Sequence, residues 1–232
     1  MTRIVAGILV VFLVFLLVCE FTLPGFAASS LEKVITASEL RPGKVEAEVV
    51  VFPAARLLFG GVDQVILNLY DLPLKEGMRI SLLQMRFPQS QFQWWKLRES
   101  QEMPFKTGGP IAVKVVVSEE DLNGYLQKAG LKGISSPLLD LDADGVRLEG
   151  KVNFLGSSLS VQLWGNFRIL DDGGVEFFPT DLKVEGKSLP PELVQKLASH
   201  LCFCFSPQEL PFSFRAKNVH TEEKTLVITG EI

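Results

Sequence analysis

Apolar and polar residues alternate along most of the chain, which predicts a protein built mainly from β-strands. In residues 44–51, valine or alanine occupies every second position, and lysine or glutamate occupies most of the others. Successive side chains of a strand point to opposite faces, so this segment is expected to have one buried and one solvent-facing side. Between Leu82 and Leu83 the alternation slips by one position, which predicts a β-bulge. The other segments with this pattern are 65–69, 78–87, 111–117, 146–154, 159–169, 175–185, 212–219 and 226–232.

Helical spacing is found in a few other segments. Ser29 and Glu32 have the spacing of a capping box, which predicts a helix over residues 29–38. Ser118 stands before three acidic residues, and this arrangement favours the N-terminus of a second helix. Gly130 is expected to end that helix.

Two more segments complete the predicted elements. Residues 54–59 are expected to form two helical turns, and residues 191–205 form a long amphipathic helix that begins at a pair of prolines. Because each helix has an apolar face to bury and the sheet offers one, the sequence predicts an α+β fold with helices packed on a curved antiparallel β-sheet. The apolar stripe of the last helix comprises Leu193, Leu197, Leu201 and Phe205.

Residues 1–27 form a separate hydrophobic segment ahead of the β-rich domain, residues 28–232. Arg3 precedes an uncharged run from Ile4 to Val18, which is shorter than the about 20 residues that a membrane-spanning helix needs. The small residues near Ala27 suit a signal peptide cleaved there, whereas the apolar residues after the run would lengthen an uncleaved anchor. In both cases the positive charge stays in the cytoplasm. We therefore expect an extracytoplasmic protein of the cell envelope, either secreted or membrane-anchored.

Composition and charge narrow the possible functions. The net charge is −4 and no run of lysine or arginine is present, which argues against binding to nucleic acid. Hydrophobic residues make up 47% of the chain, enough for a sizeable core. Phenylalanine is frequent, with 17 residues against 2 tyrosines, so much of the aromatic surface carries no polar group.

Catalytic chemistry has little support in the sequence. The chain contains two histidines, His200 and His220, and no Gly-x-Ser-x-Gly motif. We expect these histidines at a helix end and in a hairpin turn, and we expect no enzymatic activity and no cofactor.

Metal binding is equally weakly supported. Asp140–Gly145 matches the first half of a calcium loop, but the closing acidic position is Lys151, so a strand and turn is favoured. His200, Cys202 and Cys204 cannot meet one ion on a helix, because the middle residue points away from the other two. Free buried thiols are the favoured state of these cysteines, and no metal site is expected.

A cluster of tryptophan and cationic residues lies in the irregular segment that precedes residue 110. Paired indole rings beside cations suit the head-group region of a bilayer, where the rings sit at the interface and the cations meet phosphate. The alternative is an edge strand with one tryptophan in the core. The residues concerned are Trp94, Trp95, Lys96 and Arg98.

Several short motifs follow one another in a defined order, and Val117–Leu126 is the most specific of them. In this order they resemble the LmeA-like phospholipid-binding family of bacterial envelopes, over nearly the whole chain after the N-terminal segment. The other motifs are Leu23–Pro24, Phe52–Pro53, Leu57–Gly60, Gly145–Val146, Phe178–Pro179, Gly186–Pro190 and Leu210–Phe212.

The resemblance implies a non-enzymatic lipid-binding protein outside the cytoplasm. It also implies a fold similar to tubular lipid-binding (BPI-like) domains, in which a strongly curved antiparallel sheet wraps around a long amphipathic helix. The partners are then a phospholipid and the membrane surface. An apolar groove between sheet and helix would hold the acyl chains, lined by Leu193, Leu197, Leu201, Phe205, Leu122 and Leu126. The alternative is a membrane-tethered structural or protein-interaction module without a ligand.

Overall fold

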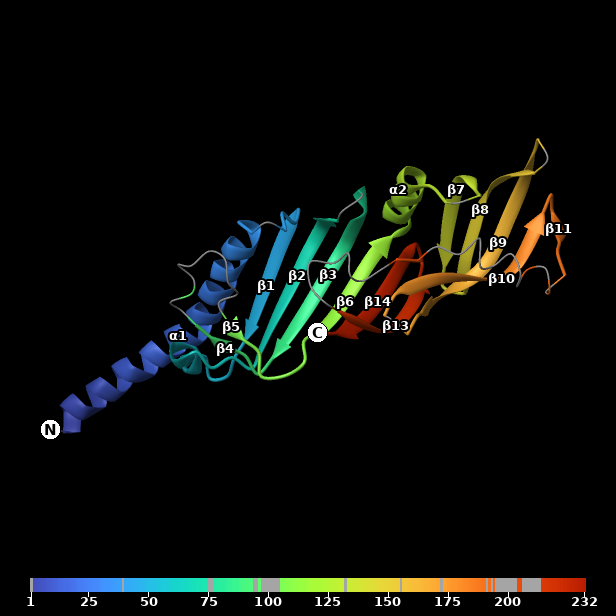
Figure 1. Cartoon of the computed structure of the whole chain (residues 1–232). Coiled ribbons are helices and arrows are strands. Elements are labelled where there is room, and N and C mark those ends of the chain that lie inside the picture. Colours follow the sequence, from blue (N-terminus) through green and yellow to red (C-terminus); the bar gives the residue numbers. More distant parts are fainter. Residues whose placement is uncertain are drawn as a thin grey trace. The chain divides into compact units, whose positions relative to one another are not determined.

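The chain forms two compact units in a computed structural model (Figure 1). Unit 1 comprises Met1–Leu69 and Gln84–Ala112, and unit 2 comprises Tyr70–Leu83 and Val113–Ile232. The structure describes residues 2–38, 40–74, 77–93, 96, 105–131, 133–154, 156–171, 173–190, 192, 194, 204–205 and 214–232.

Antiparallel strands dominate the described residues, as the α+β prediction requires. One six-stranded sheet has the order β1-β2-β3-β6-β14-β13, and a second has the order β11-β10-β9-β8-β7 with β12 paired to β10. The strands of the first sheet are β1 (Lys44–Val50), β2 (Gln64–Pro73), β3 (Arg79–Pro88), β6 (Ala112–Ser118), β13 (Arg215–Glu222) and β14 (Thr225–Glu231). Those of the second are β7 (Ser135–Asp142), β8 (Gly145–Phe154), β9 (Ser157–Ile169), β10 (Val175–Val184), β11 (Lys187–Ser188) and β12 (Cys204–Phe205).

The predicted alternation is visible in the burial of the strands. In β2, Val65, Leu67 and Leu69 are fully buried while their neighbours are partly exposed. In β3 the buried set changes phase between Ile80 and Leu83, at the position where the sequence pattern slips. The core of each unit is therefore built from the residues that the period-two pattern selects.

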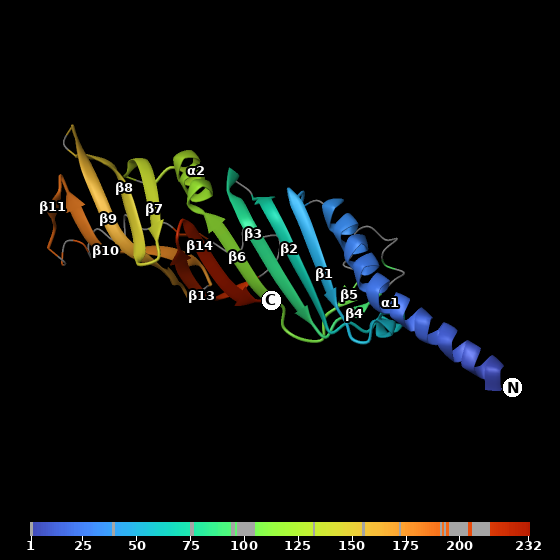
Figure 2. The same cartoon turned by 180° about the vertical axis from the view of Figure 1, so that it is seen from behind.

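Unit 1 is organised around α1 (Thr2–Thr36), which packs beside β1 and the 3₁₀-helix η1 (Ala54–Phe59) (Figure 2). Two short strands, β4 (Gln91–Phe92) and β5 (Phe105–Lys106), form a small hairpin in the same unit. The N-terminal half of α1 extends away from the strands, as both views show.

Unit 2 contains the second helix, α2 (Glu119–Ala129), which packs on β7. The predicted cap is confirmed, because the Ser118 hydroxyl accepts a hydrogen bond from the N–H of Asp121 at 3.1 Å. Gly130 follows the helix with a φ of 71°, and its N–H donates to the Leu126 carbonyl. The predicted start and end of this helix are both correct.

Two local predictions are wrong. Ser29 does not begin a helix, because α1 runs through it from Thr2. A capping-box pattern describes local spacing, and it cannot show that the preceding apolar run is helical as well. His220 lies inside β13, and Glu223 and Lys224 form the turn before β14.

Candidate functional site

The helix α1 changes character along its length. Every described large apolar side chain from Ile4 to Val18 is more than half exposed, with relative exposures of 51–70%. After Val18 one face of the helix is buried in unit 1, through Cys19, Ala27, Leu31 and Ile35. The region from Gly7 to Thr36 is long and apolar enough to cross a membrane, with a mean hydropathy of 2.5. The first half of α1 thus suits a lipid environment, and the second half is part of the folded unit.

Two glutamates of α1 bind backbone N–H groups of its neighbours. The Glu32 carboxylate accepts a hydrogen bond from the N–H of Ala47 in β1 at 3.0 Å. Because β1 is the edge strand of its sheet, this contact satisfies a donor that the sheet leaves unpaired. The Glu20 carboxylate accepts from the N–H of Ala54, the first residue of η1, at 2.8 Å. Pro53 precedes η1 and supplies no side-chain cap, so Glu20 supplies one from another element.

The loop that carries η1 is held by a compact polar clamp. The Arg56 guanidinium pairs with the Asp63 carboxylate at 2.7 Å and also donates to the Phe52 carbonyl at 3.1 Å. The N–H of Phe52 donates to the same carboxylate at 2.9 Å. The Phe52 N–H and the Arg56 guanidinium stabilise the charged carboxylate, and they lower the pKa of Asp63 below its usual value.

Glycine ends η1 where the chain approaches β4. Gly60 has a φ of 82°, a left-handed conformation, and a Cβ there would lie 2.4 Å from the Phe92 carbonyl oxygen. The N–H of Phe92 in turn donates to the Gly60 carbonyl at 2.6 Å. The end of η1 is therefore fixed against the β4–β5 hairpin.

Large apolar side chains project into solvent around this loop and the adjacent part of α1. We name these five residues the apolar collar: Phe21 (83% exposed), Phe26 (63%), Phe52 (77%), Leu58 (48%) and Phe59 (88%). Sequence reasoning missed the collar, because alternation and helical spacing select residues for a core. The unbroken Leu-Leu-Phe at the end of a short helix was the sequence feature that could have indicated an exposed apolar surface.

The residues predicted to meet head groups lie in the segment between β4 and β5. Trp94, Trp95 and Arg98 are outside the described residues. Lys96 is half-buried, and its backbone N–H donates to the Gln93 carbonyl at 3.0 Å. Phe92 of β4, two residues before the predicted cluster in the sequence, is the residue that contacts Gly60.

The predicted groove residues fall into three groups. Leu193, Leu197 and Leu201 are outside the described residues. Leu122 and Leu126 are each 2% exposed and lie on α2, which packs on β7. Phe205 is not on a helix, because it lies in β12 and pairs with Val175 of β10. The prediction of a helix that continues to Phe205 is therefore wrong. Residues 201–205 alternate large apolar side chains with cysteines, and this period-two pattern was the sequence evidence for a strand.

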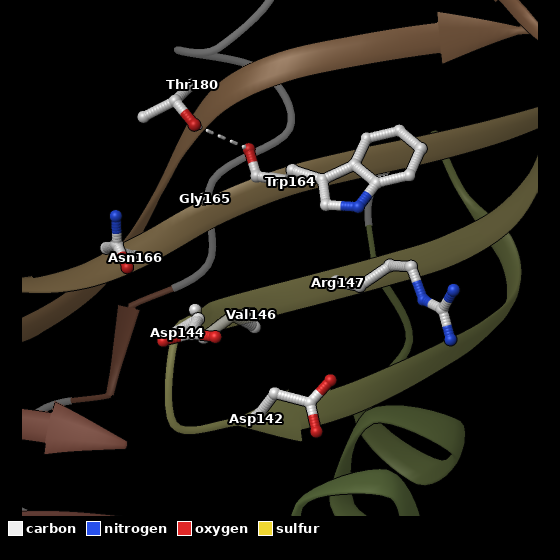
Figure 3. Close-up of a pocket in the computed structure, with 9 residues that line it drawn as sticks. Asp142, Asp144, Val146, Arg147, Trp164, Gly165, Asn166 and Thr180 are labelled. Atoms are coloured by element: carbon white, nitrogen blue, oxygen red, sulfur yellow. Dashed lines mark hydrogen bonds between the residues drawn. The ribbon is translucent and has the colours of Figure 1, made fainter. Parts of the chain in front are cut away.

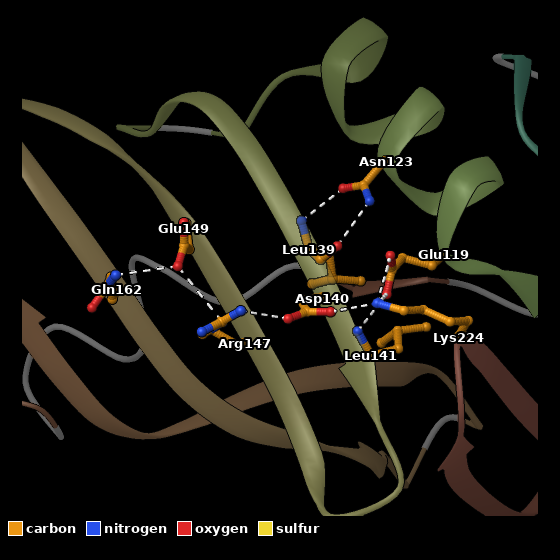
Figure 4. Close-up of polar contacts among 9 residues, drawn as sticks. All are labelled: Glu119, Asn123, Leu139, Asp140, Leu141, Arg147, Glu149, Gln162 and Lys224. Carbon is orange, nitrogen blue, oxygen red and sulfur yellow. Dashed lines mark hydrogen bonds and ion pairs between the residues drawn. The ribbon is translucent and has the colours of Figure 1, made fainter.

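Side chains of α2 pin the edge strand of the second sheet (Figure 4). The Asn123 amide donates to the Leu139 carbonyl at 2.8 Å and accepts from the Leu139 N–H at 2.7 Å. The Glu119 carboxylate accepts from the N–H of Leu141 at 2.7 Å. Within the Val117–Leu126 motif, these two polar residues thus attach the helix to β7.

A chain of charged groups crosses the same surface (Figure 4). The Lys224 ammonium contacts Asp140 at 2.8 Å and Glu119 at 3.1 Å, and these carboxylates raise the pKa of Lys224 to about 12. Arg147 pairs with Asp140 at 2.5 Å, and the hydrogen bonds from Lys224 and Arg147 lower the pKa of Asp140. The strand-and-turn interpretation of Asp140–Gly145 is confirmed, since these residues form the β7–β8 hairpin.

Two cavities lined by described residues lie in unit 2, and polar atoms form most of their walls. The first, of about 280 Å³, lies beside the β7–β8 turn, where Thr180 donates to the Trp164 carbonyl at 3.2 Å (Figure 3). The second, of about 400 Å³, adjoins the β9–β10 turn and the start of β13. An acyl chain requires apolar walls, so neither cavity is an acyl-chain pocket. The first is lined by Asp142, Asp144, Gly145, Val146, Arg147, Trp164, Gly165, Asn166 and Thr180.

Comparison with protein families places the chain in one of them. Searches of curated proteins and of solved structures gave no match. The model of the LmeA-like phospholipid-binding family matches residues 18–231. The match begins beside Cys19, the first buried residue of α1 among those described, and ends with β14, so it includes the buried part of the helix and most of both units. Because it covers nearly the whole chain, the protein belongs to the LmeA-like phospholipid-binding family.

Proposed function

We propose that this protein binds phospholipid outside the cytoplasm while α1 holds it in the membrane. The observation that carries the proposal is the family match over residues 18–231, because that family is described as phospholipid-binding. The exposed apolar surface from Ile4 to Val18 gives independent support for a lipid environment. Lipid binding is proposed as a non-enzymatic activity.

The acyl chains are proposed to lie in an apolar groove between the second sheet and the segment between β11 and β12. Within that segment, Val194 is a described residue and its side chain is 4% exposed, which supports a buried position for this side chain. Burial of each CH₂ group is worth roughly 0.8 kcal/mol, so two long chains provide enough free energy to offset the cost of ordering a lipid. Leu122 and Leu126 of α2 are each 2% exposed, and we therefore propose that the later segment, rather than α2, lines the groove.

We also propose that α1 is retained rather than cleaved after Ala27. Ala27 is fully buried in the middle of the helix, and cleavage there would remove the Glu20 carboxylate from the N–H of Ala54. The intact mass of the protein purified from membranes tests this directly. A mass that starts at residue 28 would contradict retention and would leave lipid binding to be judged separately.

A photoreactive phospholipid tests lipid binding itself. The full chain in detergent is mixed with a phosphatidylglycerol that carries a diazirine on one acyl chain, irradiated, digested and mapped by mass spectrometry. Labelled peptides from residues 112–232 that disappear with excess unlabelled lipid are the expected result. Residues 4–18 of α1 should be labelled in any case, and they calibrate the reaction. Labels confined to those residues would support the alternative, a tethered module without a ligand.

A further inference from the structure

We propose that the apolar collar inserts into the membrane interface and holds unit 1 against the bilayer. The occupant of this surface is the boundary between head groups and acyl chains of the membrane that α1 enters. The inference rests on the anchoring part of the proposed function, and it concerns a different surface from the lipid groove.

The exposure of the collar is the first argument. Phe59 and Phe52 are 88% and 77% exposed, although phenylalanine is among the residues most often buried. They lie on one short loop, with Leu58 between them in the chain. Clustered exposed apolar side chains of this size mark a surface that another phase or partner covers.

The position of the collar along α1 identifies that phase. As a helix, the run from Ile4 to Val18 is about 22 Å long, whereas the hydrocarbon core of a bilayer is about 30 Å thick. Because the run is shorter than the hydrocarbon core, an α1 that spans the bilayer also needs its next turn, and this places Glu20 and Phe21 near the membrane boundary. Because the Glu20 carboxylate binds the first N–H of η1, the loop with Phe52 and Phe59 comes to the same level.

The clamp beneath the loop makes insertion favourable. Arg56 and Asp63 bind each other, and between them they bind both backbone groups of Phe52, so the loop is ordered before it meets the membrane. The charge of Asp63 is neutralised by its partner beside the collar. A preorganised apolar surface loses little conformational freedom on insertion, and phenylalanine and leucine are typical of the apolar face that interfacial segments bury in the membrane.

Crosslinking from the collar tests the proposal in the full chain. The substitution Phe59→p-benzoylphenylalanine is made, the chain is reconstituted into vesicles of phosphatidylcholine and phosphatidylglycerol, and crosslinked lipid is measured by mass spectrometry after irradiation. The matched control is Lys44→p-benzoylphenylalanine, at an exposed residue about 20 Å away at the other end of β1. Interfacial segments bury their apolar face about 5–10 Å deep, so we expect about tenfold more lipid adduct from position 59 than from position 44.

A third position separates this proposal from the anchoring of α1. Phe12→p-benzoylphenylalanine reports whether α1 is in the bilayer. Adducts at position 12 with none above the Lys44 level at position 59 would overturn the collar proposal and leave the anchor intact. Crosslinked dimers of the chain from position 59, in place of lipid adducts, would also overturn it and would assign the collar to a second copy. Adding Phe52→Asp should lower the lipid yield at position 59 several-fold, whereas Phe52→Leu should preserve it.

Discussion

The carboxylate of Glu20 accepts a hydrogen bond from the backbone N–H of Ala54 at 2.8 Å, and this contact joins the membrane-length helix to the loop that carries the collar. The two residues are far apart in sequence, and neither belongs to a recognisable motif. Glu20 also interrupts the hydrophobic segment, where an acidic residue is unfavourable in a bilayer. The contact explains why the helix carries an acid at this position.

Replacing Glu20 with alanine should loosen η1. The change leaves the first N–H of η1 without its acceptor, and loss of a helix cap costs about 0.5–2 kcal/mol. We expect faster amide hydrogen exchange over residues 54–57, measured by mass spectrometry on the full chain in detergent. Glu48→Ala is the matched control, because Glu48 is an exposed residue of β1. Equal exchange in the two variants would contradict the capping role.

Gly60→Ala should lower the stability of unit 1 by more than the free energy of placing alanine in a left-handed conformation. A left-handed conformation costs an L-residue about 1–2 kcal/mol, and the new Cβ would also lie 2.4 Å from the Phe92 carbonyl oxygen. Gly156→Ala is the control, because Gly156 has nearly the same φ of 83° and nothing within 4 Å of the added Cβ. Thermal unfolding followed by circular dichroism should show a larger loss for Gly60→Ala. Equal losses would mean that the approach to β4 is unimportant.

Elements that local chemistry determines were predicted well from sequence. The cap at Ser118, the stop at Gly130 and the phase slip between Leu82 and Leu83 depend on residues within one turn or one strand. The structure places each of them as the pattern indicated. The order of the strands in the two sheets could not be predicted from the sequence pattern, because strand pairing depends on contacts between distant segments.

Features that depend on tertiary partners were missed for the same reason. Ser29 and Glu32 have capping-box spacing, yet the Glu32 carboxylate binds the N–H of Ala47 in the edge strand. Phe205 continues an apolar stripe of helical period, yet pairing with Val175 places it in a strand. The collar was missed because exposure cannot be read from hydrophobicity alone.

Lys224→Met should lower stability, and the difference from the wild type should vanish in strong alkali. Asp140 and Glu119 raise the pKa of Lys224 to about 12 in the folded chain, from 10.5. A raised pKa means that the stabilising contribution is complete below pH 10.5 and is lost as the pH rises through about 12. Methionine has no greater difficulty than lysine with the φ of 61° at this position. The midpoint of thermal unfolding of both proteins, measured from neutral pH to strong alkali, checks the prediction, and a constant difference would contradict it.

Leu126→Ala should destabilise unit 2 without affecting lipid labelling. Leu126 of α2 is 2% exposed, and truncating a buried leucine costs about 2–5 kcal/mol because it leaves a cavity. Leu126→Met is the matched control, since a swap that conserves volume costs less than about 1.5 kcal/mol. The measurements are chemical unfolding and the yield of the diazirine phospholipid in peptides from residues 112–232. If Leu126 instead lined the groove, Leu126→Ala would change the yield or position of the lipid label, while its stability stayed near that of Leu126→Met. That result would place the acyl chains beside α2.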